Sequence, residues 1–168
     1  AVVDHHPPDP GAVEGLVENH VNPYLHDEDY AVTTGMLCVE LARMIAPDIT
    51  EDVRHVPAVA GLADRSEGEG MADYLSLARE AGYDESHLQD IGEALDYATF
   101  WLRYNDGREL IYDILDVNCD DTDRHAELVD LLAERAQQDV DAQLGVAMEH
   151  VTHGTLDNGA HLYRVDVE

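Results

Sequence analysis

The sequence contains no lysine, and this absence excludes one large class of nucleotide-binding proteins. All nine basic residues are arginine, against 37 acidic residues, which gives a formal net charge of −28. A Walker A phosphate loop needs lysine. No run of about 18 apolar residues occurs, so we expect no membrane span. Only three serines occur, none in a Gly-x-Ser-x-Gly pattern. A serine hydrolase with a nucleophile elbow is therefore excluded as well.

Cysteine is also scarce. Cys38 and Cys119 are far apart and form no Cys-x-x-Cys pair. A disulfide scaffold is excluded at this size and cysteine count. Cys38 lies in the apolar stretch 34–42, so we predict that it is a small buried hydrophobic side chain.

Acidic residues are abundant instead, with 22 Asp and 15 Glu. This composition predicts a halophilic protein in a high-salt cytoplasm, where self-repulsion is screened and hydrated carboxylates maintain solubility. A G+C-rich genome would explain the missing lysine but not the charge. In such a solvent the acidity does not exclude a nucleic-acid partner, because it reflects the salt rather than the substrate.

The pattern of apolar residues predicts a helix-rich α/β fold, and 45% apolar residues are enough for a core. The strands are expected over 1–4, 20–24 and 160–168. The helices are expected over 30–45, 50–63, 71–81, 84–104, 108–117 and 120–150, with Thr50 as an N-cap and a loop over 152–159. Since so few strands accompany so many helices, we expect a piece of a longer protein with upstream strands missing.

The first candidate site is Asp4-His5-His6, directly after the first strand. Ligands of α/β proteins bind beyond the carboxyl ends of strands. Imidazole and carboxylate together suit Mn²⁺, Fe²⁺ or Zn²⁺, and an aspartate can orient a ligating histidine. The alternative is a surface loop with two solvated histidines.

The second candidate site is Asp64, which ends an apolar helix of small residues. A buried carboxylate is unfavourable unless it is paired or bound to metal. Asp is also disfavoured at a helix C-terminus. Arg65 beside it suits a phosphate. The alternative is an ordinary helix end facing water.

Four aromatic residues at helical spacing form a third feature: Tyr97, Phe100, Trp101 and Tyr104. Core packing is the favoured interpretation. Exposed aromatics that stack on the bases of a single strand are the alternative, supported by the nearby Arg103 and Arg108.

Four segments in this order resemble the DHH phosphoesterase family, and in particular its archaeal RecJ-like single-strand exonucleases. These segments are Val-Val-Asp-His-His at 2–6, Val-Asn-Pro at 21–23, Thr34 to Arg43, and Ala58 to Ser66. The resemblance implies a partial DHH catalytic domain over 1–118, the helix-rich end of a parallel-sheet domain. A long connecting helix over 119–151 and a loop and strand beginning another domain over 152–168 would follow.

The resemblance also implies a chemistry. Family members use two divalent ions, Mn²⁺ or Mg²⁺, to activate water against a phosphodiester or phosphoanhydride. His5 and Asp64 match metal ligands, and Asp4 matches the aspartate that supports the histidine. His6 matches the histidine that faces the scissile phosphate. Apart from the resemblance, we expect Arg65 to be catalytic, because a guanidinium beside Asp64 suits a phosphate.

One departure from the family concerns its first motif. An Asp-x-Asp cluster and a further metal-binding Asp should precede Asp4, and only three residues do so. We therefore expect the longer protein to be the enzyme, and this chain alone to bind metal weakly and not to turn over.

Several functions remain open. The favoured one is a single-strand exonuclease in DNA repair, with single-stranded DNA or RNA as substrate and replication or repair proteins as partners. A family member acting on short oligonucleotides, cyclic dinucleotides or nucleotide phosphates is the second. The third is a non-catalytic interaction module over 84–150. In a helical domain with a chance motif, Asp64 would lie far from His5.

Overall fold

A computed structural model describes residues 1–8, 19–27, 31–66, 68–101, 108–117, 122–149, 151–156 and 159–165. The strands are β1 (Val2–Val3), β2 (His20–Val21), β3 (Val151–Thr155) and β4 (His161–Val165). The α-helices are α1 (Thr34–Ile45), α2 (Val56–Ala63), α3 (Glu69–Glu80), α4 (Glu85–Trp101), α5 (Arg108–Ile114) and α6 (Thr122–Glu149), with 3₁₀ helices η1 (Pro23–His26) and η2 (Pro47–Ile49). The expected helix-rich α/β fold class is confirmed.

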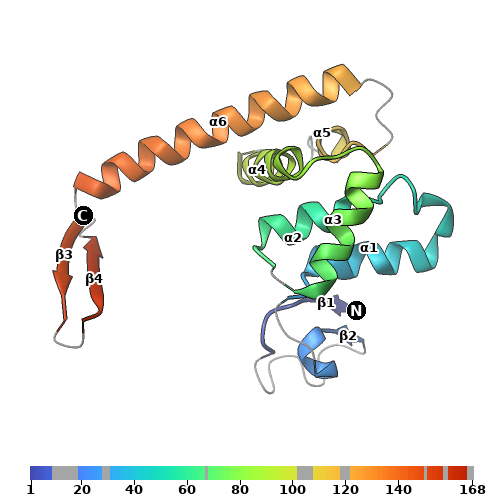
Figure 1. Cartoon of the computed structure of the whole chain (residues 1–168), viewed down its shortest axis with the longest axis horizontal. Coiled ribbons are helices and arrows are strands. Elements are labelled where there is room, and N and C mark those ends of the chain that lie inside the picture. Colours follow the sequence, from blue (N-terminus) through green and yellow to red (C-terminus); the bar gives the residue numbers. More distant parts are fainter. Residues whose placement is uncertain are drawn as a thin grey trace.

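The elements are stacked in layers above a small parallel sheet (Figure 1). β1 and β2 pair in parallel, with Val2 opposite His20 and Val3 opposite Val21. α1 lies against β1, α2 packs between α1 and α4, and α6 crosses α4. The core runs through these layers and is formed by fully buried residues, among them Met36, Val59, Leu88, Ile91, Ile114 and Val129.

The first two helices approach each other closely because small residues line their contact. A Cβ atom on Gly35 would lie 2.5 Å from the Cβ of Ala60. Thr33 caps α1, and its Oγ1 accepts a hydrogen bond from the backbone N–H of Met36 at 3.3 Å. The N-terminus of α1 is therefore held in one place against α2.

Single residues in the sequence correctly predicted where α3 ends and where α4 begins. α3 ends as predicted at Gly82, whose φ of +99° suits glycine. Asp84 precedes α4, and its Oδ1 accepts the backbone N–H of His87 at 2.9 Å. α6 spans Thr122–Glu149, within the predicted long helix.

Three expectations are wrong: the N-cap at Thr50 that would begin the second helix, the burial of Cys38, and the loop over 152–159. Thr50 is not an N-cap, because its hydroxyl donates to the carbonyl of Pro47 and closes η2. α2 begins at Val56 instead, because Pro57, which lacks an N–H, is tolerated in a first helical turn. Cys38 is exposed on α1 rather than buried.

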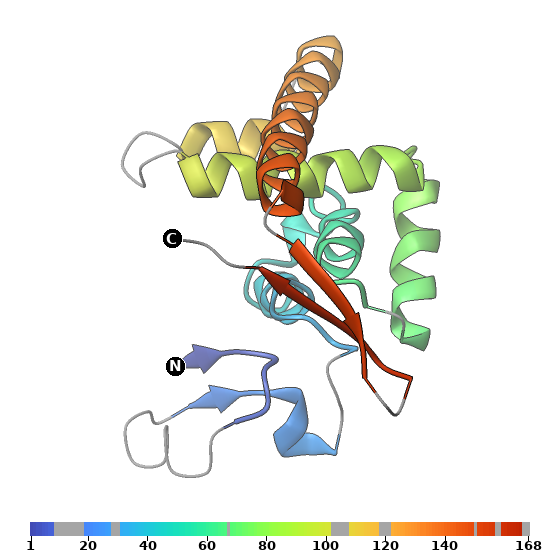
Figure 2. The ribbon, with the colours of Figure 1, turned by 90° about the vertical axis from the view of Figure 1, so that its left-hand side faces the viewer.

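The third wrong expectation is the loop over 152–159, because Val151–Thr155 is strand β3. It pairs antiparallel with β4, with Val151 opposite Val165 and Thr155 opposite His161. This hairpin lies at the far end of α6, in front of the helical layers in Figure 2. Of the helices in the described part of the chain, none has the length and apolar character needed to cross a bilayer.

Candidate metal centre

Asp4 stands at the carboxyl end of β1. Its backbone N–H donates to the carbonyl of Val21 at 3.1 Å, which continues the pairing with β2. The chain then turns, and Asp4 Oδ1 accepts the backbone N–H groups of His5 at 2.9 Å and of His6 at 3.3 Å. The carboxylate thus organises the turn that presents both histidines, beyond the strand end where α/β proteins place ligands.

The Asp4 carboxylate also orients the His6 ring. His6 Nδ1 lies 2.8 Å from Asp4 Oδ1, and this hydrogen bond is the main reason why the pKa of Asp4 falls below its usual value. The His6 side chain is 74% exposed, so its ring faces solvent. With Nδ1 donating to Asp4, the Nε2 atom of His6 is left for an external group.

Asn22 holds the other side of the turn. Its side chain is buried, its Nδ2 donates to the carbonyl of His6 at 2.9 Å, and its Oδ1 accepts the backbone N–H of Tyr24 at 3.0 Å. Asn22 is part of the segments that resemble the DHH family, but the sequence predicted no role for it. An Asn-Pro pair directly after a strand was the signal that could have identified it.

His5 and Asp64 come together from distant parts of the chain. His5 Nε2 lies 3.9 Å from Asp64 Oδ2. The His5 side chain is only 16% exposed, whereas that of Asp64 is 47% exposed. On its other side, His5 Nδ1 lies 2.8 Å from Thr34 Oγ1, and the backbone N–H of Thr34 donates to it at 3.2 Å. Sequence reasoning missed Thr34, which follows the helix-capping residue Thr33.

Asp64 reaches this place because α2 ends there. It is the C-cap of α2, and Arg65 follows with a left-handed φ of +53°. Ser66 then donates its hydroxyl to the carbonyl of Ala31, just before α1. The turn at the end of α2 is thereby fastened to the start of α1. Arg65 is exposed next to Asp64, and its role beside a phosphate stays a prediction.

The residues present fit a divalent ion. Ligand atoms of Asp4, His5 and His6 all lie within 4.8 Å of one another. Asp64 Oδ2 lies 3.9 Å from His5 Nε2. This distance is too long for a hydrogen bond between the two side chains, but it allows both to bind one ion. Imidazole and carboxylate donors suit Mn²⁺ and similar ions. The metal-binding roles of His5 and Asp64 nevertheless stay predictions.

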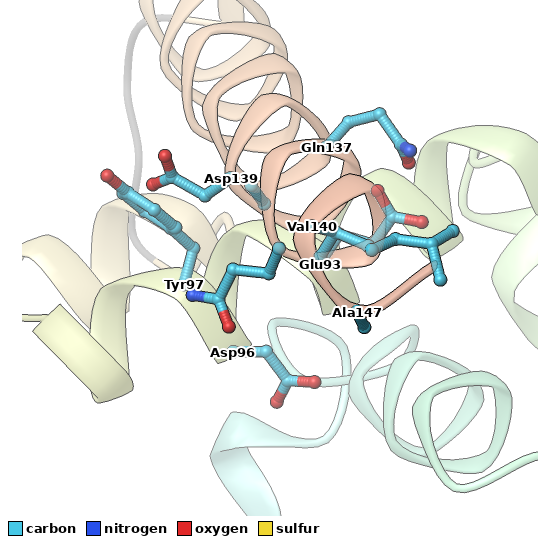
Figure 3. Close-up of a pocket in the computed structure, with 10 residues that line it drawn as sticks. Glu93, Asp96, Tyr97, Gln137, Asp139, Val140 and Ala147 are labelled. Atoms are coloured by element: carbon cyan, nitrogen blue, oxygen red, sulfur yellow. The ribbon is translucent and has the colours of Figure 1, made fainter. Parts of the chain in front are cut away.

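A separate groove of about 720 Å³ lies between α4 and α6, away from these residues. Its lining includes Glu93 and Asp96 on α4, and Asp139 and Leu144 on α6 (Figure 3). Tyr97, half-buried, belongs to this lining, while the rest of the predicted aromatic stripe lies outside the described side chains. Three carboxylates make the groove unsuited to a polyanion.

Two known proteins are similar to this chain over nearly its whole length. No protein-family model matches. An uncharacterized protein of Methanocaldococcus jannaschii is 35% identical over an alignment of 184 positions, which covers 99% of this chain and 24% of that protein. A solved structure described as a DHH domain from a member of the S1p family of ribosomal proteins is 34% identical. It has a TM-score of 0.88 and matches 98% of this chain and 39% of its own.

This chain therefore spans well under half the length of either relative. Its fold matches that of a DHH domain. The likeness supports the resemblance to the DHH phosphoesterase family on which the site residues were chosen.

Proposed function

We propose that this chain is part of a metal-dependent phosphodiesterase of the DHH family, with Mn²⁺ or Mg²⁺ held at His5 and Asp64 and with Asp4 supporting the site. One observation carries the proposal: His5 Nε2 and Asp64 Oδ2 lie 3.9 Å apart beside the Asp4–His6 turn. In a helical domain with a chance motif, no reason would bring these groups together. The DHH fold of the solved relative adds support.

The arrangement suggests a division of roles. His5 Nε2 and Asp64 Oδ2 would hold a divalent ion, and Asp4 would orient the turn and the His6 ring. Divalent ions, when bound, lower the pKa of water and neutralise charge that develops on a phosphate. His6, largely exposed, would bind the scissile phosphate, and Arg65 would pair with its unesterified oxygens. No nucleophilic side chain is needed.

A single-stranded nucleic acid, digested from one end, is the substrate that we propose. His6 and Asp64 are open to solvent, so the site can admit a polymer. The solved relative is described as a ribosomal protein, which favours RNA over DNA. Short oligonucleotides and nucleotide phosphates are the other substrates to compare, because the same chemistry would cleave them.

A non-catalytic interaction module is the second candidate, and one observation favours it. α6 carries large apolar side chains that are half or more exposed: Leu131, Val140, Leu144, Val146 and Met148. Such a surface suits a protein partner, for example from replication or repair. This candidate predicts that the Asp4–His6 turn is dispensable for function.

Mn²⁺-dependent digestion of end-labelled strands separates the candidates. The full-length protein containing this chain is compared with its His5→Ala and Asp64→Ala variants on 5′- and 3′-labelled RNA and DNA in molar KCl. His26→Ala and Asp130→Ala are matched controls, because both side chains are exposed and outside the site. Loss of activity in the two site variants, but not in the two controls, supports the enzyme proposal. The label that is released first gives the polarity of digestion. Activity indifferent to both site changes would favour the interaction module.

A further inference from the structure

His5 is held from behind by the first residue of α1. Its Nδ1 atom lies 2.8 Å from Thr34 Oγ1 and accepts the backbone N–H of Thr34 at 3.2 Å, across 29 positions of sequence. Thr34 has little freedom to move, because Thr33 caps the helix and Gly35 abuts Ala60. Thr34 is therefore held in place beside Nδ1 of His5.

These contacts bear on which ring nitrogen of His5 carries the proton. A neutral imidazole has one N–H and one lone pair. The backbone N–H of Thr34 is only a donor, so by itself it favours a lone pair on Nδ1 and a proton on Nε2. That proton would then point toward Asp64, on the side where Nε2 faces Oδ2 at 3.9 Å.

Metal binding needs the opposite arrangement. To bind a cation, Nε2 must offer its lone pair, and the proton must move to Nδ1, where it requires an acceptor. The hydroxyl oxygen of Thr34, at 2.8 Å, can accept as well as donate by rotating about its C–O bond. The backbone N–H beside it cannot.

We propose that Thr34 is a positioning residue whose hydroxyl accepts the Nδ1 proton of His5 and so makes Nε2 available to a divalent ion. The inference rests on the proposed function, because it takes His5 to be a metal ligand. Metal-free His5 holds its proton on Nε2, with Nδ1 accepting from Thr34. In the metal-bound state the proton sits on Nδ1 and is donated to Thr34 Oγ1.

The test measures Mn²⁺ affinity and the His5 tautomer in the full-length protein that contains this chain. Affinity is measured by electron paramagnetic resonance titration with Mn²⁺ alone, in about 1 M KCl to screen weak binding by surface carboxylates. The tautomer is read from ¹⁵N–¹H correlations of the ring, with and without Zn²⁺. Thr34→Val removes the hydroxyl and keeps the backbone N–H, and Thr34→Ser keeps both. Thr50→Val is the matched control, because the Thr50 hydroxyl donates to the carbonyl of Pro47, beyond the opposite end of α1.

We expect Thr34→Val to weaken Mn²⁺ binding by roughly ten- to a hundredfold, the usual effect of losing a partner of a ligating histidine. Thr34→Ser and Thr50→Val should bind as the unchanged chain does. The unchanged chain with Zn²⁺ should show His5 protonated on Nδ1, whereas Thr34→Val should retain the proton on Nε2 at the same Zn²⁺ concentration.

His5→Gln distinguishes the two ways to fail. If His5→Gln weakens Mn²⁺ binding and Thr34→Val changes neither affinity nor tautomer, the role of Thr34 is wrong and the proposed metal centre stands. If His5→Gln leaves Mn²⁺ binding unchanged, or the unchanged full-length protein binds no Mn²⁺ at millimolar concentration, both the metal centre and the role of Thr34 are wrong.

Discussion

His5 Nε2 lies 3.9 Å from Asp64 Oδ2, although one residue follows the first strand and the other ends α2. The contact depends on three separate features of the fold. The Asp4 carboxylate shapes the turn that carries His5, Thr34 supports the ring from behind, and Ser66 fastens the end of α2 to the start of α1. The proposed metal centre would therefore depend on local turns as much as on its ligands.

Replacement of Asn22 should destabilise the turn that presents the histidines. In Asn22→Ala the carbonyl of His6 and the backbone N–H of Tyr24 lose their buried partner. We expect the free energy of unfolding to fall by about 1–3 kcal/mol. Denaturant titration measures it, with Asn19→Ala as control, because the Asn19 side chain is exposed. Equal stability of the two variants would show that Asn22 does not hold the turn.

Replacement of Gly35 should disturb the packing of α1 against α2. In Gly35→Ala the new methyl group would lie 2.5 Å from the Cβ of Ala60, so we expect a loss of about 1–3 kcal/mol. Gly145→Ala, in the C-terminal part of α6 with open space around it, should instead stabilise the chain by up to about 1 kcal/mol.

The second change Ala60→Gly provides the check on this mechanism. Added to Gly35→Ala, it removes the clashing methyl group and should recover part of the lost stability. If the loss of stability in the double variant is as large as the losses of the two single variants added together, the contact between these residues is not the cause.

Acid should destabilise the helical layers through His55. Burial is the main cause that lowers the pKa of His55 below its ordinary value of 6.5, and its Nε2 lies 2.6 Å from the carbonyl of Leu115. The unfolded chain therefore binds a proton near pH 6.5 that the folded chain does not yet bind. The contribution of His55 to stability is full above this pH and falls as the pH drops through 6.5, until the lowered pKa is reached.

His55→Gln tests this dependence because glutamine keeps a donor for Leu115 and does not titrate. Denaturant titrations between pH 5 and 8 should show a shallower loss of stability for the variant than for the unchanged chain. Parallel pH profiles would exclude His55 as the cause. Tyr83, which stacks on His55 at 4.2 Å, is left unchanged in both proteins.

Salt should stabilise the chain strongly. The formal net charge is −28, and self-repulsion of that size opposes a compact state. Raising KCl from about 0.1 M to about 2 M shortens the screening length from about 10 Å to less than about 3 Å. We expect the thermal unfolding midpoint to rise over this range. A midpoint that stays the same or falls over this range would contradict charge screening as a stabilising effect.

Local features were predictable from the sequence. The C-terminal end of α3 and the start of α4 followed from Gly82 and Asp84, because these residues act on their immediate neighbours. The predicted N-cap at Thr50 was wrong because a threonine hydroxyl, which can cap a following helix, here closes the preceding helix η2. β3 was missed because its residues Thr152 to Thr155 carry little apolar alternation, and only pairing with β4 makes them a strand.

The candidate site was predictable in part. The residue types at Asp4, His5 and Asp64 suggested metal chemistry, but nothing local indicated that His5 and Asp64 would approach each other. The resemblance to the DHH family supplied that expectation. Asn22 and Thr34 were missed because their roles come from contacts across 16 and 29 positions of sequence.

The most direct test of the central claim asks whether His5 and Asp64 bind the same ion. Mn²⁺ affinity is measured for the unchanged chain, His5→Gln, Asp64→Asn and the double variant, in molar KCl. Ligands of one ion are not independent, so each single change should weaken binding by more than about tenfold, and the double change should add little to the larger single effect. Effects that multiply in the double variant, or unchanged binding by Asp64→Asn, would contradict a shared metal centre.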